Sequence, residues 1–141
     1  ACLGLGATIV TNTREIAADD FFTGLFETAL EPGEIITAVR FPKPRRAAYM
    51  KFPNPASRYA IVGVFVAETA DGIRVGVSGA SQSGAYRSSD LEAALTANFA
   101  PQAVEGVSVS ADGLNSDIHA SAEYRAHLIK VMAKRAVAAA G

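Results

Sequence analysis

Residues 49–67 read YMKFPNPASRYAIVGVFVA, and this stretch decides the fold of the chain. Its second half, residues 60–67, is apolar at every position and rich in valine. The run is short and β-branched, which disfavours a buried helix, so it predicts a strand with both faces covered. A loop with two prolines separates this strand from a short β-like segment at residues 49–52.

The residues that follow predict one small domain folded onto this strand. Asp71-Gly72 is a strong signal for a tight turn. Residues 73–78 then alternate between apolar and polar or small side chains, which is typical of a strand with one solvated face. Together they predict an antiparallel hairpin, and the Ser- and Gly-rich residues 79–84 predict a flexible loop after it.

Three helical segments complete this predicted domain. Residues 89–98 predict a helix in which Ser89 and Glu92 form a capping box. Residues 101–107 predict a second, shorter helix, and residues 121–140 predict a long one. Four residues of the long helix share one face at helical spacing: Tyr124, Leu128, Val131 and Met132.

The residues upstream predict the edge of another structure. Residues 7–10 and 35–41 predict short strands, and EPGE at 31–34 has the chemistry of a tight turn. Asp19 or Asp20 is expected to cap a helical turn, because a carboxylate accepts hydrogen bonds from free backbone N–H groups.

Composition limits the classes of protein to consider. The chain has 141 residues, about one domain, and is 50% hydrophobic and 19% charged, as in ordinary globular proteins. No apolar run approaches the roughly 20 residues of a membrane span, and we expect no signal peptide. A single cysteine, Cys2, excludes an internal disulfide framework and fits a reducing compartment, so we expect a cytoplasmic protein.

Charge is concentrated in one segment. Six of the thirteen basic residues lie between Arg40 and Arg58, and no carboxylate occurs between Glu34 and Glu68. Within this segment PKPRR, residues 42–46, predicts a linker. The segment could attract an anionic ligand or an acidic partner, or it could be a solvated connection. Nucleic-acid binding is not expected, because no aromatic residues interleave with the cations as an RNA-binding pattern requires.

Complete catalytic motifs are absent from the sequence. His119 and His127 have no accompanying metal-ligand set, and no nucleophile elbow or P-loop occurs. Gly4-Leu5-Gly6 begins a dinucleotide fingerprint, but Ile9 occupies the position of the third glycine. We therefore expect no catalytic residue and no metal ligand in this chain.

Tyr49 and Lys51 are the candidates for one wall of a site. They lie two residues apart on a predicted strand, so their side chains point the same way. A phenol ring and an ammonium on one face can contact a flat, electron-rich ligand. The alternative is that Tyr49 belongs to the core and that Lys51 is merely solvated.

Four passages resemble one known family. They read ADDFFTGLFETAL (18–30), EPGEIITAVRFP (31–42), YMKFPNPASRYAIVGVFVA (49–67) and ASAEYRAHLIKVMAKRAV (120–137). In this order they resemble the FAD-binding medium subunits of molybdenum hydroxylases, the carbon monoxide dehydrogenase and xanthine dehydrogenase family. The last passage resembles the final helix of those subunits.

The resemblance implies an α+β fold with two parts. Residues 1–42 would be the C-terminal remnant of an FAD-binding domain. Residues 47–141 would be a carbon monoxide dehydrogenase flavoprotein C-terminal-like domain, with an antiparallel sheet of about three strands packed with helices. The Gly-rich pyrophosphate motifs of the family have no match here. We therefore expect a C-terminal fragment of a longer subunit, which on its own is inactive and binds little FAD.

The resemblance also implies a function in electron transfer. Electrons would pass from a molybdenum–pterin centre in a large subunit through 2Fe–2S clusters in a small subunit to FAD, and on to an external acceptor. Tyr49 and Lys51 would approach the isoalloxazine, and Ile36 would line it.

Two further expectations concern partners. The surface around Phe21, Phe22 and Ile35 should be apolar and exposed, so the fragment should self-associate. The alternative function is a non-enzymatic interaction module that docks an acidic partner through residues 40–58.

Overall fold

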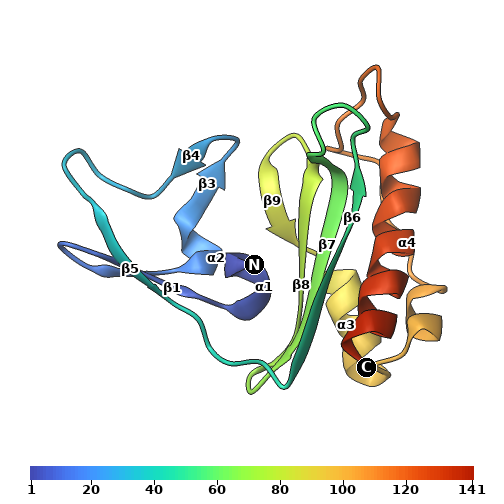
Figure 1. Cartoon of the computed structure of the whole chain (residues 1–141), viewed down its shortest axis with the longest axis horizontal. Helices are drawn as coiled ribbons and strands as arrows, with labels where there is room; N and C mark the ends of the chain where they lie inside the picture. Colours follow the sequence, from blue (N-terminus) through green and yellow to red (C-terminus); the bar gives the residue numbers. More distant parts are fainter.

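The structure is a computed structural model that describes residues 1–141, and Figure 1 shows two regions joined by an extended connection. The N-terminal region, residues 1–41, is built from short strands and two short helices. The region from residue 46 onward is an antiparallel sheet with helices on one face. The α+β class predicted from the sequence is therefore confirmed.

The larger sheet has four strands in the order β6-β7-β8-β9. Their bounds are Arg46–Pro53 (β6), Ala60–Thr69 (β7), Gly72–Ser81 (β8) and Gly84–Arg87 (β9). The predicted β7–β8 hairpin is confirmed, and every neighbouring pair is antiparallel. The predicted loop at residues 79–84 is wrong: β8 continues to Ser81, and β9 makes a fourth strand. Small residues with weak strand preference hid this second hairpin.

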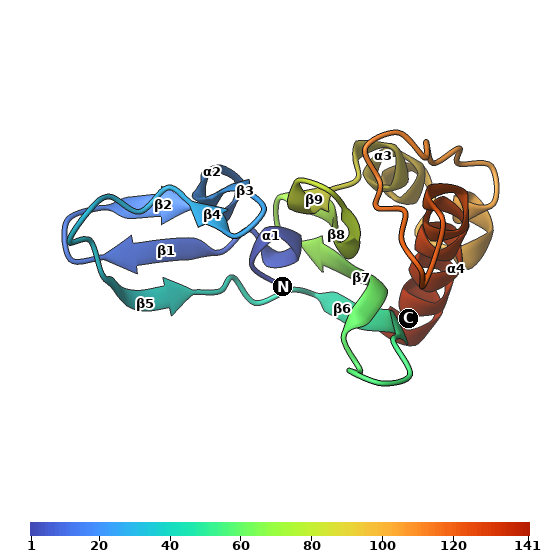
Figure 2. The ribbon, with the colours of Figure 1, turned by 90° about the horizontal axis from the view of Figure 1, so that it is seen from above.

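Three helical elements cover one face of this sheet (Figure 2): α3 (Ser89–Ala97), η1 (Pro101–Val104) and α4 (Ala122–Ala140). Apolar residues at alternate positions of β7 and β8 enter the core between sheet and helices, as strand geometry requires. The largest fully buried side chains of this core are Val62, Val64, Val66, Val75, Val77, Leu91, Leu95, Val104, Ile129 and Met132.

The predicted core face of α4 is only partly right. Leu128 and Met132 are buried, but Tyr124 is 44% exposed. Its ring meets the Phe52 ring edge to face and stacks with the His127 ring. The helix also buries a charged residue that an apolar pattern cannot reveal. Arg125, 3% exposed, donates hydrogen bonds to the carbonyls of Ile61 (2.7 Å) and Gly79 (3.1 Å) and to Asp117 (2.6 Å).

The predicted capping box of α3 is not formed. Ser88 is the N-cap residue, and its side chain makes no capping hydrogen bond. The Glu92 carboxylate instead accepts a hydrogen bond from the Val75 backbone N–H (2.9 Å) and two from the Arg87 guanidinium (2.8 and 2.7 Å). The Arg87 guanidinium, which lies outside the helix, thus binds the carboxylate that the capping box would use.

The N-terminal region contains a three-stranded sheet in the order β2-β1-β5 and a small β3–β4 pair. The elements are α1 (Cys2–Leu5), β1 (Thr8–Thr11), β2 (Glu15–Ala17), α2 (Ala18–Phe21), β3 (Phe22–Gly24), β4 (Glu27–Thr28) and β5 (Ile36–Arg40). The strands predicted at residues 7–10 and 35–41 are thus present. All five residues of β5 are exposed.

Two expectations for α2 are corrected. Ala17 is its N-cap residue, and Asp19 instead forms ion pairs with Arg74 (2.5 Å) and Arg87 (3.1 Å) of the larger sheet. Phe21, expected on the surface, is 5% exposed because it packs with Ile9 and Ile16.

The turn predicted at residues 31–34 is present, with Gly33 at φ 81°. The side chain of Glu34 holds this turn against β1. It accepts hydrogen bonds from Arg14 (2.9 and 3.0 Å), Thr11 (2.7 Å), Thr13 (2.9 Å) and the Glu31 backbone N–H (2.9 Å). The bond from Arg14, followed by that from Glu31, lowers the pKa of Glu34 far below its ordinary value.

Helix α1 joins the two regions by packing on the face of the sheet opposite the helices. A Cβ at Gly4 would overlap the Phe65 ring, and a Cβ at Gly76 would lie 3.4 Å from the Gly4 nitrogen. Arg74 Nε donates a hydrogen bond to the Leu3 carbonyl at 2.8 Å. Strand β7 is therefore covered on both faces, as its continuous apolar run predicts.

Candidate functional site

Tyr49 and Lys51 both project from β6 on the face that α1 covers, which we call the inner face. Met50 and Phe52 alternate with them and pack against the core on the helical side. Tyr49 is 45% exposed and Lys51 is exposed, so the alternative that placed Tyr49 in the core is wrong. The shared direction predicted from their spacing is correct.

An apolar cavity of about 170 Å³ lies between α1, β3 and the inner face. Three aromatic residues, Phe22, Tyr49 and Phe65, contribute to its wall, and Tyr49 and Ser78 are the lining residues with a hydroxyl. The lining residues are Ala1, Cys2, Leu3, Phe22, Tyr49, Phe65, Gly76, Val77, Ser78 and Ala85. No carboxylate is among them.

Gly63 allows the Tyr49 ring to lie close to the backbone of β7. A Cβ at this position would overlap the Tyr49 hydroxyl and approach Ser78 Oγ to 2.9 Å. The phenol therefore lies directly over the strand, next to Ser78, and any larger residue at position 63 would displace it.

Lys51 lies beside this cavity and does not line it. Its Nζ donates a hydrogen bond to the Arg58 carbonyl at 3.0 Å, and no carboxylate forms an ion pair with it. Ile36 lies on the other sheet, where it is 41% exposed and paired with Thr11. The structure thus brings Tyr49 and Lys51 to one face but leaves Ile36 outside the cavity.

The basic segment at residues 40–58 is partly neutralised. Arg40 pairs with Glu15, and Arg45 and Arg46 pair with Glu68 at 3.4 and 2.7 Å. These carboxylates are more than 20 residues away in sequence, so a count along the chain overstates the positive charge of the surface. The segment offers little support for an acidic docking site.

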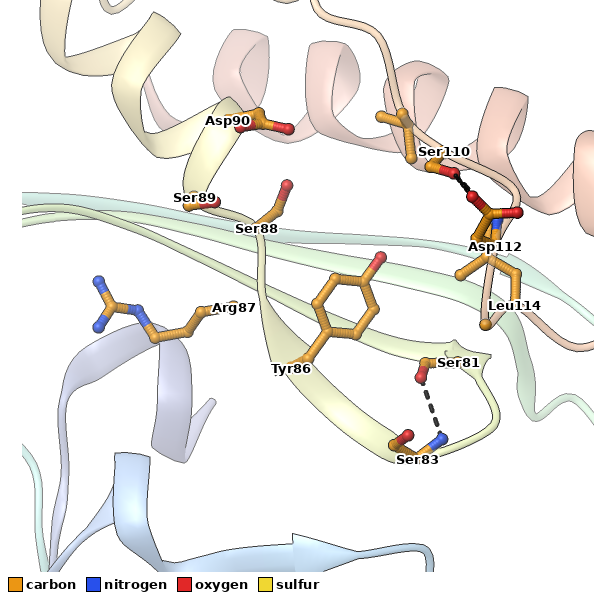
Figure 3. Close-up of a pocket in the computed structure, with 12 residues that line it drawn as sticks. Ser81, Ser83, Tyr86, Arg87, Ser88, Ser89, Asp90, Ser110, Asp112 and Leu114 are labelled. Atoms are coloured by element: carbon orange, nitrogen blue, oxygen red, sulfur yellow. Dashed lines mark hydrogen bonds between the residues drawn. The ribbon is translucent and has the colours of Figure 1, made fainter.

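A larger, polar cavity of about 330 Å³ lies on the opposite side of the sheet, near β9 and the start of α3 (Figure 3). Five serines and the Tyr86 ring contribute to its lining, and burial raises the pKa of Tyr86. The Arg87 guanidinium at its edge is engaged by Glu92 and Asp19. No local sequence pattern predicts this cavity, because its walls come from three separate parts of the chain: residues 81 and 83, residues 86–90, and residues 109, 110 and 112–114.

No group of three or more His, Cys, Asp or Glu side chains is placed to hold a metal ion. His119 and His127 are both exposed. No helix combines the length and apolar character needed to cross a bilayer.

Residues 1–44 match a protein family described as the FAD binding domain in molybdopterin dehydrogenase. The medium subunit of nicotine 6-hydroxylase from Paenarthrobacter nicotinovorans is 36% identical to this chain. The alignment is 142 residues long and includes 94% of this chain. The carbon monoxide dehydrogenase medium chain of Afipia carboxidovorans is 28% identical over 149 residues, covering 96% of it. The chain is a relative of the medium subunits of molybdenum hydroxylases.

Solved structures of medium-subunit relatives support the same assignment. Reconstituted carbon monoxide dehydrogenase from Oligotropha carboxidovorans superposes with a TM-score of 0.81 at 26% identity, covering 99% of this chain. Quinoline 2-oxidoreductase from Pseudomonas putida 86 superposes with a TM-score of 0.77 at 25% identity, also over 99%. The resemblance to this family inferred from the sequence is confirmed.

The chain spans about half the length of these medium-subunit relatives. It covers 50% of the nicotine 6-hydroxylase subunit, 52% of the carbon monoxide dehydrogenase chain and 53–54% of the two solved chains.

Proposed function

We propose that this chain acts as part of the FAD-containing medium subunit of a molybdenum hydroxylase, and that its inner face forms one wall of the flavin site. The observation that carries the proposal is the placement of Tyr49 and Lys51 on one exposed face beside an apolar cavity, in a relative of the medium subunits.

The chemistry of this wall fits an isoalloxazine ring. Phe22, Tyr49 and Phe65 offer apolar aromatic surface to a flat ring system, and aromatic pairs gain energy from offset or edge-to-face contact. The absence of carboxylates avoids repulsion of a reduced, electron-rich flavin. The cavity is smaller than the roughly 300 Å³ at which typical ligand pockets begin, so it can enclose only part of FAD.

Each residue of the wall has a separate role. Bound FAD supplies the redox chemistry that links iron–sulfur clusters to an external acceptor. Tyr49 orients the ring by contact with its face or edge, and Lys51 places a hydrogen-bond donor and a positive charge beside it. Such a charge favours a more negative ligand. Ile36 is proposed to contact the ring from the N-terminal region.

The proposed domains, partners and cellular location follow from the similarity to the medium subunits. Residues 1–42 are proposed to complete an FAD-binding domain, and residues 47–141 to form the C-terminal domain of the subunit. The partners are a large molybdenum–pterin subunit and a small subunit with 2Fe–2S clusters, in the cytoplasm. The names of the relatives refer to nicotine, carbon monoxide and quinoline. The choice of substrate is proposed to lie with the large subunit.

The test uses the full-length medium subunit purified with its partners. It should show flavin absorbance, and Lys51→Ala should lower the flavin midpoint potential by roughly 20–40 mV, equivalent to about 1–2 kcal/mol for a two-electron couple. Lys43→Ala is the matched control, because it removes one positive charge from the linker outside the inner face. A complex that releases no FAD on denaturation, or equal potentials for the wild type and Lys51→Ala, would refute the proposal.

A further inference from the structure

The ammonium of Lys51 is held by a neutral group. Its hydrogen-bond acceptor is the backbone carbonyl of Arg58, at 3.0 Å. A carboxylate would hold the ammonium equally well but would cancel its charge, and none occurs between Glu34 and Glu68. The carbonyl fixes the position of the cation and leaves its charge available.

The backbone that presents this carbonyl is in an unusual conformation. Arg58 has φ 64°, in the left-handed region that residues with a Cβ adopt only when their surroundings impose it. It is the penultimate residue of the connection between β6 and β7. The left-handed residue therefore requires a source of stabilisation nearby.

Asn54 provides that stabilisation. It is buried, and its Oδ1 accepts hydrogen bonds from the backbone N–H groups of Ala56 (2.9 Å) and Ser57 (3.2 Å). Its own carbonyl accepts from the Arg58 N–H at 2.9 Å, and its N–H donates to the Tyr59 carbonyl at 2.7 Å. The backbone of Asn54 is thus hydrogen-bonded both to Arg58 and to the residue that follows it, Tyr59.

We propose that the turn at residues 54–59 positions Lys51 on the inner face. Asn54 holds Arg58 in the left-handed conformation, and the Arg58 carbonyl in turn holds the Lys51 ammonium. Asn54 and Arg58 are positioning residues, and the side chain of Arg58 has no part in the contact. The consequence for the flavin rests on the proposed function, whereas the geometry of the turn does not.

Two substitutions of Arg58 separate its backbone from its side chain. Both Arg58→Gly and Arg58→Val remove the guanidinium. Glycine enters the left-handed region without a steric penalty, and a β-branched residue strongly resists it. Arg58→Gly should keep Lys51 in place, and Arg58→Val should release it, as should Asn54→Ala. Asn54→Asp retains an oxygen acceptor and should behave like the wild type.

The first measurement needs no flavin. Lys51 in the 141-residue chain is acetylated with an N-hydroxysuccinimide ester, and its rate is read by mass spectrometry against Lys43 as internal reference. Loss of one hydrogen bond should increase the acetylation rate of Lys51 about fivefold in Asn54→Ala and Arg58→Val. Arg58→Gly and Asn54→Asp should stay at the wild-type rate. Equal rates in Arg58→Gly and Arg58→Val would overturn the proposal, even if Asn54→Ala fails to fold.

The second measurement is the flavin midpoint potential of the full-length subunit with its partners. Asn54→Ala and Arg58→Val should shift it in the same direction as Lys51→Ala, and Arg58→Gly should leave it unchanged. A shift of equal size in both Arg58 variants would show that the guanidinium acts directly and would overturn the positioning role. If Lys51→Ala itself has no effect, the proposed function fails, and the acetylation rates still decide the role of the turn.

Discussion

Glu34 accepts five hydrogen bonds from four residues, and its side chain is only 3% exposed. These bonds join the turn at residues 31–34 to the end of β1, so one carboxylate fixes the geometry of the strands on both sides. All five bonds stabilise the ionised form. The pKa of Glu34 is therefore depressed in the folded chain, above all by Arg14.

This depression has a definite pH dependence. A carboxyl group whose pKa is lowered on folding stabilises the fold above its unfolded pKa, and this contribution declines as the pH falls below about 4.5. We expect Glu34→Gln to destabilise the chain at pH 7 and the difference from the wild type to shrink as the pH falls below that value. Urea denaturation at pH 7 and pH 3 measures the free energy of unfolding of the wild type and of Glu34→Gln. A difference between the two proteins that is larger at pH 3 than at pH 7 contradicts the expectation.

Single residues differ in how well the sequence predicts them. The common direction of Tyr49 and Lys51 follows from the two-residue period of a strand, which is a local property. The partners of Asp19 are 55 and 68 residues away, so its ion pairs depend on tertiary structure. The same holds for Arg125, whose buried guanidinium binds carbonyls up to 64 residues distant. For Asp19 a local rule predicted a cap, and no local pattern singled out Arg125.

At the scale of elements, α1 depends on the absence of side chains at its contact with the sheet. Gly4 lies against the Phe65 ring, and Gly76 of β8 lies against the backbone of Gly4. Two glycines therefore allow a helix of four residues to approach the strands closely and to bury Leu3.

Gly4→Ala tests this close approach. Alanine favours helix formation, but its Cβ would overlap Phe65, so we expect a net loss of about 1–3 kcal/mol in the free energy of unfolding, typical of overpacking. The double variant Gly4→Ala/Phe65→Ala should lose less than the sum of the two single variants. Gly106→Ala is the control, because no atom lies within 4 Å of its Cβ position. Additive losses in a urea titration would contradict the expected overlap.

Elements with a strong local pattern were predicted well, and those without one were missed. The β7–β8 hairpin has a continuous valine-rich run and an Asp-Gly turn, and α4 has a long helical period. Strand β9 has four residues of mixed character, GAYR, and gains its strand geometry by pairing with β8. The cavity at Tyr49 was beyond prediction because α1, β3 and all four strands of the larger sheet contribute to it.

At the scale of the whole molecule, exposed apolar side chains gather in the N-terminal region. They are Phe22 (39%), Leu25 (53%), Phe26 (99%), Ile35 (65%), Ile36 (41%), Val39 (37%) and Phe41 (50%). Exposed apolar surface favours association. The chain spans about half the length of its medium-subunit relatives.

We expect the 141-residue chain to self-associate through this surface. Phe26→Asn should weaken the association, because it removes the most exposed of these apolar side chains. Asparagine is chosen because it tolerates the left-handed backbone of position 26 (φ 61°). Ile118→Asn is the matched control, because Ile118 is 96% exposed but belongs to the other region. Sedimentation velocity over a range of concentrations measures both. A chain that stays monomeric throughout, or equal effects of the two substitutions, would contradict this expectation.

The N-terminal region is attached to the larger sheet at both of its ends, by α1 at the start and by the connection into β6 (Figure 1). A body fixed at two points can still rotate about the line that joins them, and a third point removes that rotation. The ion pairs of Asp19 with Arg74 and Arg87 provide this third point. The orientation of the N-terminal region relative to the inner face, where Tyr49 and Lys51 lie, is therefore fixed by three attachments, and one of the three is electrostatic.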